Sequence, residues 1–257
     1  MFGKKKKGGI HEKGNEHHAL QLITDKGMPF GYVEAYKSLR TNLDFMAGSM
    51  DVHTLVITST VPEESKSNVA VNLALTLAES GKKVVLVDCD LRKPVLHRYL
   101  KAGHNVKGVS NVLSNQCTLD EALQELKEMN MTFLPAGTPP PNPSEMLSQP
   151  QMQAMVNTLR EKFDVVIFDA PPVSVVTDAA VIGRCVDGAM FVVRSDYAPA
   201  DAVRGAVKKL QDAGVRVLGS VLTRYDMKKA LKGSSYAYSY AYNYNYAYEK
   251  QKADVVE

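Results

Sequence analysis

The apolar positions of this chain fall into six short, nearly continuous runs, which alternate with stretches of helical periodicity. Runs of this length are typical of strands buried on both faces, and helices between them are typical of a parallel sheet. The predicted strands lie in residues 54–59, 82–90, 131–137, 163–172, 188–195 and 215–223, and the predicted helices in residues 33–46, 66–81, 150–162 and 200–214. The pattern therefore predicts an α/β fold, a mostly parallel sheet with helices on both faces.

Other stretches set the organisation of the chain. Residues 33–46 place four apolar side chains on one helical face, namely Tyr36, Leu39, Leu43 and Met46. Residues 135–147 are too rich in proline for regular structure, and they predict an ordered surface loop. The apolar periodicity stops near Asp226, so we expect three parts: a basic flexible arm (1–28), one folded domain (29–226) and a disordered tyrosine-rich tail (227–257).

The composition narrows the possible classes of protein. The chain has 257 residues, 45% hydrophobic and 23% charged, with a net charge of +3, which excludes a wholly disordered chain and gives no strong nucleic-acid signature. Cys89, Cys117 and Cys185 form no C-x-x-C pair and suit a reducing cytosol. No apolar run approaches the roughly 20 residues of a membrane span. The basic start lacks the apolar region of a signal peptide, so it is either a solvated tail or a contact with an anionic membrane surface.

Residues 56–74, VITSTVPEESKSNVAVNLA, have the layout of a phosphate-binding loop. A predicted strand runs into a loop, and Lys66 and Ser67 then begin a helix, whose free N–H groups and dipole attract phosphate. In the P-loop pattern G-x-x-x-x-G-K-[ST], lysine adds a positive charge, the hydroxyl holds Mg²⁺, and two glycines let the backbone wrap the phosphates. The residues near the two glycine positions here are Ser59 or Thr60, and Ser65. The alternative interpretation is a solvent-facing lysine at a helix start.

Three aspartates lie where predicted strands end. Asp88 and Asp90 stand in VVLVDCDLRKP, and Asp169 stands in VVIFDAPP. The carboxyl ends of strands in an open α/β sheet point to the crevice where ligands bind. Together with Lys66 and Ser67, these carboxylates predict a Mg²⁺-nucleotide site with a spare base. Helix capping or simple solvation explains any one of the three aspartates, but explains all three poorly.

The order of these motifs resembles that of the bacterial tyrosine kinases of capsule and exopolysaccharide operons. P-x-x-x-K-S comes first, a strand ending in D-x-D-x-R-K-P follows, then a strand ending in D-x-P-P, and last a tyrosine-rich C-terminus. The stretch PPNPSEML is similar to one that is common in this family. The family belongs to a P-loop group that includes Min-type and partition ATPases. The resemblance therefore implies a P-loop NTPase-type sheet and a protein-tyrosine kinase that depends on ATP and Mg²⁺.

The resemblance assigns a role to each matching residue. It implies that Lys66 grips the β- and γ-phosphates and that Ser67 ligates Mg²⁺. It implies that Asp88 accepts the tyrosine proton, while Asp90 and Asp169 arrange Mg²⁺ and its waters. A tyrosine hydroxyl, with a pKa of about 10, is a poor nucleophile until a carboxylate accepts its proton. The catalytic set is then Lys66, Asp88, Asp90 and Arg92, and the nucleotide-binding set is Pro62, Glu63, Glu64, Ser65, Lys66, Ser67 and Asn68.

A second family motif, E-x-x-R-x-x-R, forms ring-like oligomers and matches Glu34, Lys37 and Arg40. On a helix these side chains fall within one polar stripe, opposite the apolar face, and the alternative is a solvated stripe. Lys37 stands where the family has arginine, which weakens bidentate pairing with a carboxylate. Three further positions depart from the family pattern: Glu63 and Ser65 replace glycines, and Thr223 replaces an asparagine that reads adenine.

Alternate residues near the C-terminus are tyrosines, namely Tyr236, Tyr238, Tyr240, Tyr242, Tyr244, Tyr246 and Tyr248. This alternation is also typical of a strand or of an aggregation-prone segment. Stacking against single-stranded nucleic acid requires positive charge, whereas the tail from Ser234 onward has two lysines and three acidic residues. The resemblance implies that the tail is the enzyme's own substrate and that it enters the active site of a neighbour.

The resemblance also implies partners. We expect a homo-oligomer such as a ring, a transmembrane activator of the polysaccharide co-polymerase type and a cognate tyrosine phosphatase, with no nucleic acid. The activator is expected to recruit a cytoplasmic chain to the inner face of the membrane, where autophosphorylation between subunits regulates polysaccharide synthesis and export. The alternatives are a Min- or partition-type ATPase switch, which has no use for seven tyrosines, and a degenerate nucleotide-binding scaffold.

Overall fold

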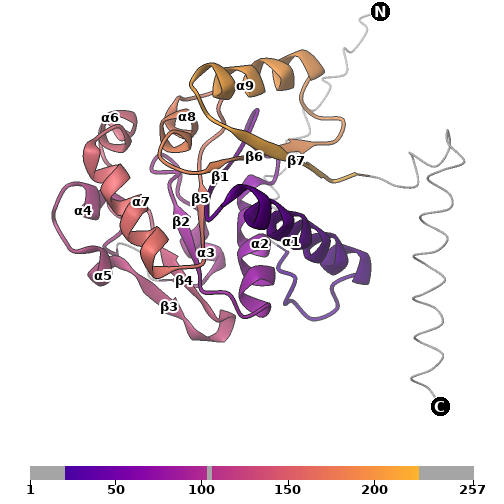
Figure 1. The fold of residues 1–257 in the computed structure, drawn as a ribbon, viewed down its shortest axis with the longest axis horizontal. Coiled ribbons are helices and arrows are strands. Elements are labelled where there is room, and N and C mark those ends of the chain that lie inside the picture. Colours follow the sequence, from indigo (N-terminus) through magenta and orange to yellow (C-terminus); the bar gives the residue numbers. More distant parts are fainter. Residues whose placement is uncertain (1–20, 103–105, 226–257) are drawn as a thin grey trace, which may run out of the picture.

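The computed structural model describes residues 21–102 and 106–225, in which seven strands form one sheet (Figure 1). The order across the sheet is β3-β4-β2-β5-β1-β6-β7, and every neighbouring pair is parallel except β3 and β4. The strands are β1 (Thr54–Ser59), β2 (Val84–Asp88), β3 (Gln124–Leu126), β4 (Met131–Leu134), β5 (Val165–Asp169), β6 (Gly188–Arg194) and β7 (Val217–Thr223). The predicted mostly parallel sheet is confirmed. The apolar pattern missed β3, because Gln124 and Leu126 are only partly buried and Glu125 is exposed in this edge strand.

Helices cover both faces of the sheet, as the alternation of elements predicted (Figure 1). The helices are α1 (Phe30–Met50), α2 (Lys66–Glu79), α3 (Leu96–Tyr99), α4 (Val109–Leu113), α5 (Leu119–Ala122), α6 (Pro143–Leu147), α7 (Pro150–Lys162), α8 (Asp178–Gly183) and α9 (Ala200–Asp212), with a short 3₁₀ helix at Lys127–Met129. Leu55 and Ile57 of β1 pack into the core beneath α1 and α2, whereas Val56 packs into the core beneath α7, α8 and α9. Two buried faces explain why the central strands are mostly apolar on both sides instead of alternating between apolar and polar residues. None of the helices in the described part of the chain is long and apolar enough to cross a membrane.

The proline-rich stretch is only partly a loop. The prediction of irregular structure is wrong for Pro143–Leu147, which forms α6. Pro143 occupies the first helical position, where its missing N–H costs no hydrogen bond and its ring presets the backbone angle. Both Pro143 and Leu147 are buried, so the helix is held by packing that the sequence pattern does not reveal.

Of the two predicted boundaries of the folded part, the structure bears on the N-terminal one. Residues 1–20 and 226–257 lie outside the described residues, so the predicted tail and its tyrosines lie outside them too. Ile23, which the sequence pattern assigns to the basic arm, is buried against the α1–α2 core. Its backbone N–H donates to Asn72 Oδ1 of α2 at 2.8 Å. Ordered packing therefore begins before residue 29.

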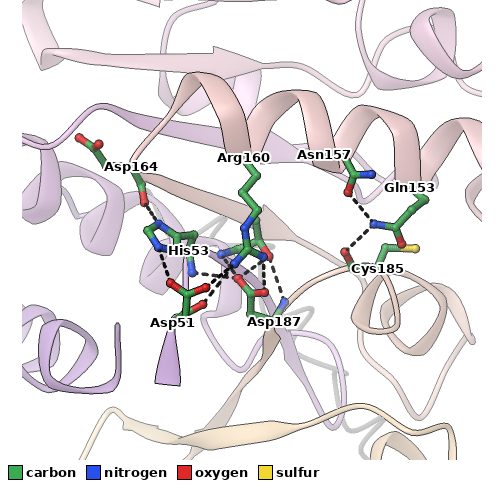
Figure 2. A network of polar contacts seen from close by, with 9 residues as sticks. Asp51, His53, Gln153, Asn157, Arg160, Asp164, Cys185 and Asp187 are labelled. Carbon is green, nitrogen blue, oxygen red and sulfur yellow. Dashed lines mark hydrogen bonds and ion pairs between the residues drawn. The ribbon is translucent and has the colours of Figure 1, made fainter. Parts of the chain in front are cut away.

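A polar network joins the amino ends of β1 and β6 to the end of α1 and to α7 (Figure 2). Asp187 Oδ2 accepts hydrogen bonds from the backbone N–H groups of His53 and Thr54, each at 2.8 Å. Arg160 of α7 pairs with Asp187 and also with Asp51, where its Nη2 lies 3.2 Å from Asp51 Oδ2. This network lies at the amino ends of the parallel strands. Ligands in open α/β sheets bind at the opposite, carboxyl ends of the strands.

Candidate active site

The predicted site residues converge at the carboxyl ends of three neighbouring strands. Lys66 and Ser67 are the first two residues of α2, directly after the loop that follows β1. Asp88 and Asp169 are register partners at the ends of β2 and β5, which pair in parallel. Parallel pairing places both carboxyl ends at the same edge, so residues far apart in the sequence lie in one site.

Lys66 lies at the centre of this site. Its Nζ is 3.3 Å from Asp90 Oδ2, 3.5 Å from Asp169 Oδ1 and 3.2 Å from Ser67 Oγ. The side chain of Lys66 is only 12% exposed and that of Asp169 is fully buried. The alternative of a solvent-facing lysine is therefore wrong, because the Lys66 ammonium pairs with the nearly buried carboxylate of Asp90 and the fully buried carboxylate of Asp169.

Burial controls the electrostatics of the site. Burial, reinforced by the charge of Asp169, raises the pKa of Asp88 well above its usual value. Burial also raises the pKa of Asp169, although Lys66 and a hydrogen bond from Ser67 act in the opposite direction. Burial alone lowers the pKa of Lys66, but the nearby aspartates outweigh it and raise that pKa. Lys66 therefore stays charged and compensates a cluster of largely buried carboxylates.

The residues present are compatible with Mg²⁺. Asp169 Oδ2 and Thr60 Oγ1 are buried and have no hydrogen-bond partner among the described residues, and such orphaned oxygens are normally paired. Within residues 21–102 and 106–225, no three or more His, Cys, Asp or Glu side chains form a cage for a metal. Mg²⁺ usually keeps several waters and takes one or two carboxylates plus substrate phosphates, so a cage is not required. Ser67 and Asp169 would hold the ion, with Asp90 nearby.

Asp88 and Asp90 are oriented by the segment that follows β2. Asp88 accepts two backbone hydrogen bonds, from the N–H of Asp90 at 3.2 Å and from that of Leu96 at 3.3 Å. Asp90 Oδ1 accepts a hydrogen bond from the Lys93 N–H at 3.0 Å. Asp88 is only 1% exposed. Its carboxyl is thus fixed and buried, and its raised pKa makes it a stronger base than an exposed aspartate.

The phosphate loop has the backbone of a glycine-containing loop without the glycines. Glu63 and Ser65 have φ angles of 67° and 70°, which lie in the left-handed region that costs residues with a Cβ roughly 1–2 kcal/mol each. These are the two positions where the family resemblance expects glycine. Glu64, between them, is fully buried, and its carboxylate accepts a hydrogen bond from the Val61 N–H at 2.8 Å. The loop keeps its shape despite these substitutions because it is held by side-chain contacts.

Arg92, one of the predicted catalytic residues, pairs with side chains of two later helices. Its Nε donates to Asp178 Oδ2 at 2.9 Å and its Nη2 donates to Asp178 Oδ1 at 3.1 Å, which makes a bidentate pair. The same Nη2 donates to Ser144 Oγ at 2.8 Å. Arg92 thereby fastens the segment after Asp90 to α8 and α6. Asp178 and Ser144 are not among the predicted site residues, although Ser144 lies within the PPNPSEML stretch.

The predicted nucleotide-binding residue Asn68 and Thr223, which replaces the family's adenine-reading asparagine, have different surroundings. Asn68 Oδ1 accepts hydrogen bonds from the hydroxyls of Tyr32 and Tyr36 of α1, at 2.9 and 3.0 Å. The side chain of Asn68 therefore binds α1 and is not directed at the phosphate loop. Thr223, at the end of β7, donates from Oγ1 to the backbone oxygen of Glu64 at 3.0 Å. Thr223 thus reaches the phosphate loop itself.

The predicted oligomer residues all lie on α1. Lys37 pairs with Glu34 at 2.7 Å, and both side chains are partly exposed. Arg40 Nη1 donates to the backbone oxygen of Thr76 in α2 at 2.8 Å. Arg40 therefore lies at the edge of the packed face of α1 and not opposite it, whereas Glu34 and Lys37 remain accessible.

The chain is similar to known proteins over most of its length. A family described as AAA domain matches residues 64–184. The tyrosine-protein kinase YwqD of Bacillus subtilis is 35% identical over 79% of this chain and 84% of its own length. The putative tyrosine-protein kinase CapB of Staphylococcus aureus is 34% identical over 79% of this chain and 87% of its own length.

Solved structures agree with these relatives. The kinase domain of the Escherichia coli tyrosine kinase ETK is 34% identical with a TM-score of 0.72, over 74% of each chain. The septum site-determining protein MinD of Pyrococcus horikoshii, in complex with Mg-ADP, has a TM-score of 0.59 over 67% of this chain and 70% of its own, and at 24% identity it shows the P-loop fold alone. The predicted resemblance is confirmed, and the chain belongs to the bacterial tyrosine-protein kinases, a family of P-loop enzymes that phosphorylate protein tyrosines.

Proposed function

We propose that this kinase uses Mg²⁺ and ATP to phosphorylate its own C-terminal tyrosines, that the transfer occurs between subunits, and that it regulates the synthesis and export of a capsular or extracellular polysaccharide. The observation that carries the proposal is the buried cluster of Lys66, Asp88, Asp90 and Asp169 at the carboxyl edge of the sheet. A phosphoryl-transfer site works mainly by positioning and by compensating charge, and this cluster offers both.

The proposed roles follow from the geometry of the site. Lys66 is the first residue of α2, and we propose that its ammonium and the free N–H groups of the first turn of that helix both bind the β- and γ-phosphates. Mg²⁺ bound to the phosphates supplies positive charge to the transferring group. Ser67 and the unpaired Oδ2 of Asp169 are the oxygens that we propose to hold it, with Asp90 orienting its waters.

Asp88 is the proposed general base. The acceptor tyrosine gives its proton to Asp88, its oxygen forms the new bond to the γ-phosphorus, and the bond from that phosphorus to the bridging oxygen of ATP breaks, releasing ADP. The buried carboxyl accepts that proton readily because burial raises its pKa. The long backbone hydrogen bonds of Asp88, at 3.2 and 3.3 Å, leave its oxygens able to accept the substrate proton.

The position of β7 supports the tail as the substrate. β7 ends at Thr223, whose hydroxyl contacts the phosphate loop, so the chain leaves the domain beside the proposed nucleotide site. Tyr236 follows thirteen residues later. Thirteen extended residues span at most about 45 Å, which allows the tyrosines to reach either their own site or that of a neighbour.

We propose that phosphorylation separates the subunits. Each phosphotyrosine adds about −1.5 to −2 charges, so seven add about −10 to −14, whereas the unmodified chain is only +3. A charged tail is repelled by a site lined with carboxylates. We propose that a transmembrane activator recruits the kinase to the inner face of the membrane and that a tyrosine phosphatase removes the phosphate from the tail. The side of α1 that carries Glu34 and Lys37 would form the contact between subunits.

The decisive experiment measures phosphotyrosine on purified protein incubated with ATP and Mg²⁺, using an antibody to phosphotyrosine. We expect strong labelling of the natural protein and none of a variant in which all seven tail tyrosines are phenylalanine. Labelling of that variant equal to the natural protein would show that the tail is not the substrate.

A mixing experiment tests transfer between subunits. An Asp88→Asn subunit with an intact tail is mixed with an active subunit whose seven tail tyrosines are phenylalanine. Phosphate on the Asp88→Asn subunit supports transfer between chains, and its absence places transfer within one chain. Light scattering should show a smaller particle after phosphorylation, and equal masses before and after would contradict separation.

A further inference from the structure

The end of β6 and the segment after it bind the phosphate loop from outside. Arg194, the last residue of β6, donates from Nη1 to the backbone oxygen of Glu63 at 3.3 Å. The hydroxyl of Tyr197 donates to the Glu63 carboxylate at 3.4 Å. The Arg194 guanidinium also lies over the Tyr197 ring, 4.2 Å from its centroid. Glu63 is therefore bound through its backbone and its side chain by two residues that also contact each other.

The neighbouring residue of the loop is bound separately. The buried carboxylate of Glu64 accepts hydrogen bonds from the backbone N–H groups of Val61, at 2.8 Å, and of Arg194, at 3.3 Å. The hydroxyl of Thr223 donates to the Glu64 backbone oxygen at 3.0 Å. The contacts to Glu64, one of which comes from the Arg194 backbone, hold the middle of the loop, whereas the side chains of Arg194 and Tyr197 contact Glu63.

Glu63 needs such support because of its backbone conformation. Its φ angle of 67° is in the left-handed region, which glycine occupies freely and glutamate disfavours. A loop that spends part of its time in other conformations binds its ligand more weakly, in proportion to the fraction that is competent. Contacts that are made only in the left-handed conformation raise that fraction.

We infer that Arg194 and Tyr197 are positioning residues that hold Glu63 in its left-handed conformation and so keep the phosphate loop ready to bind nucleotide. This inference rests on the proposed use of ATP at the loop, and it goes beyond that proposal by assigning two residues outside the motifs to nucleotide affinity. It also explains how the loop accommodates glutamate where relatives are expected to have glycine. The hydrogen bond from Tyr197 requires the carboxylate of Glu63, so it is specific to a loop with glutamate at this position.

The test is a double-mutant cycle between Tyr197→Phe and Glu63→Gly, with ATP affinity measured by calorimetry on the whole chain. Tyr197→Phe removes only the hydroxyl and keeps the ring under Arg194. We expect it to weaken ATP binding about threefold to tenfold, with kcat at saturating ATP within about twofold and the urea midpoint unchanged. In the Glu63→Gly background, glycine adopts the left-handed conformation without support from Arg194 and Tyr197. Tyr197→Phe should then leave ATP affinity unchanged.

Control variants sharpen the result. Tyr225→Phe alters a tyrosine that is 52% exposed beyond β7, and it should leave ATP affinity unchanged. Arg194→Met removes the donor to Glu63 and should weaken ATP binding in the natural background but not with Glu63→Gly. An equal loss from Tyr197→Phe in both backgrounds, or no loss in the natural one, would overturn the inference. If the natural protein itself binds no ATP, the proposed function fails instead.

Discussion

Replacing Lys66 by methionine should destabilise the whole fold in addition to removing a phosphate contact. Nζ of Lys66 pairs with Asp90 and Asp169, whose side chains are 10% and 0% exposed, and the lysine side chain is 12% exposed. Methionine fills a similar volume but leaves these carboxylates without compensating charge. Loss of activity in this variant would therefore not by itself show that Lys66 binds phosphate.

The size of the effect follows from the burial of the pair. Removing one partner of a buried ion pair costs about 3–5 kcal/mol, because the other charge stays buried and unpaired. With a urea dependence of roughly 2–3 kcal/mol per molar, that loss lowers the unfolding midpoint by about 1–2.5 M. Replacing an exposed lysine in an ion pair changes little by comparison, since water solvates both charges.

The loss should depend on pH in a defined direction. Lys66 opposes the upward effect of burial on the pKa values of Asp88 and Asp169, so the variant raises both further. A carboxyl with a raised folded pKa destabilises the folded state increasingly as the pH rises from its unfolded value of about 3.9 to its folded value. The variant should therefore be closest to the natural protein near about pH 4–5 and furthest from it at neutral pH.

Urea unfolding followed by circular dichroism, at about pH 5 and about pH 7.5, measures this effect. Lys208→Met is the matched control, since Lys208 pairs with Asp212 at 3.0 Å on the exposed surface of α9. Adding Asp169→Asn to Lys66→Met should recover part of the loss at neutral pH. Equal midpoints of Lys66→Met and the natural protein at about pH 7.5 would refute the reasoning.

Three further predictions follow from other contacts. Asp88→Asn should lower kcat by about 10²–10⁴-fold and leave ATP affinity within a few-fold by calorimetry; loss of Mg²⁺-nucleotide binding would instead make Asp88 a metal-site residue. Glu34→Arg should reduce the particle mass in light scattering without disturbing the fold, whereas Arg40→Glu also breaks a hydrogen bond to α2. An unchanged mass for Glu34→Arg would favour a solvated polar stripe over a subunit interface. Burial alone raises the pKa of Asp187, but two backbone N–H groups and Arg160 outweigh it and lower that pKa. Asp187 therefore stabilises the fold above its unfolded pKa, and this contribution is lost as the pH falls through the lowered folded value. The melting temperature of Asp187→Asn should be lower than that of the natural protein at neutral pH and approach it in acid, and a pH-independent difference would contradict this account.

The sequence by itself determined the sheet and the identity of the site. Strands such as β1, β2 and β5 are buried at every position, so their sequences are mostly apolar on both faces and stand out from the chain. The same parallel arrangement made the aspartates at their ends readable as one site, because strand ends in such a sheet share an edge. The spacing of Lys66 and Ser67 after β1 then pointed to phosphate, and relatives confirmed a tyrosine kinase.

Only the tertiary structure decided how these groups are arranged and charged. Periodicity marks Lys66 as the start of a helix, but it cannot show that two buried carboxylates surround its ammonium or that Asp178 fixes Arg92. The support of Glu63 by Arg194 and Tyr197 joins residues more than a hundred positions apart. Such contacts leave no local pattern, because they depend on which elements the fold brings together. Burial and charge, which set the pKa values of the site, arise only from that packing.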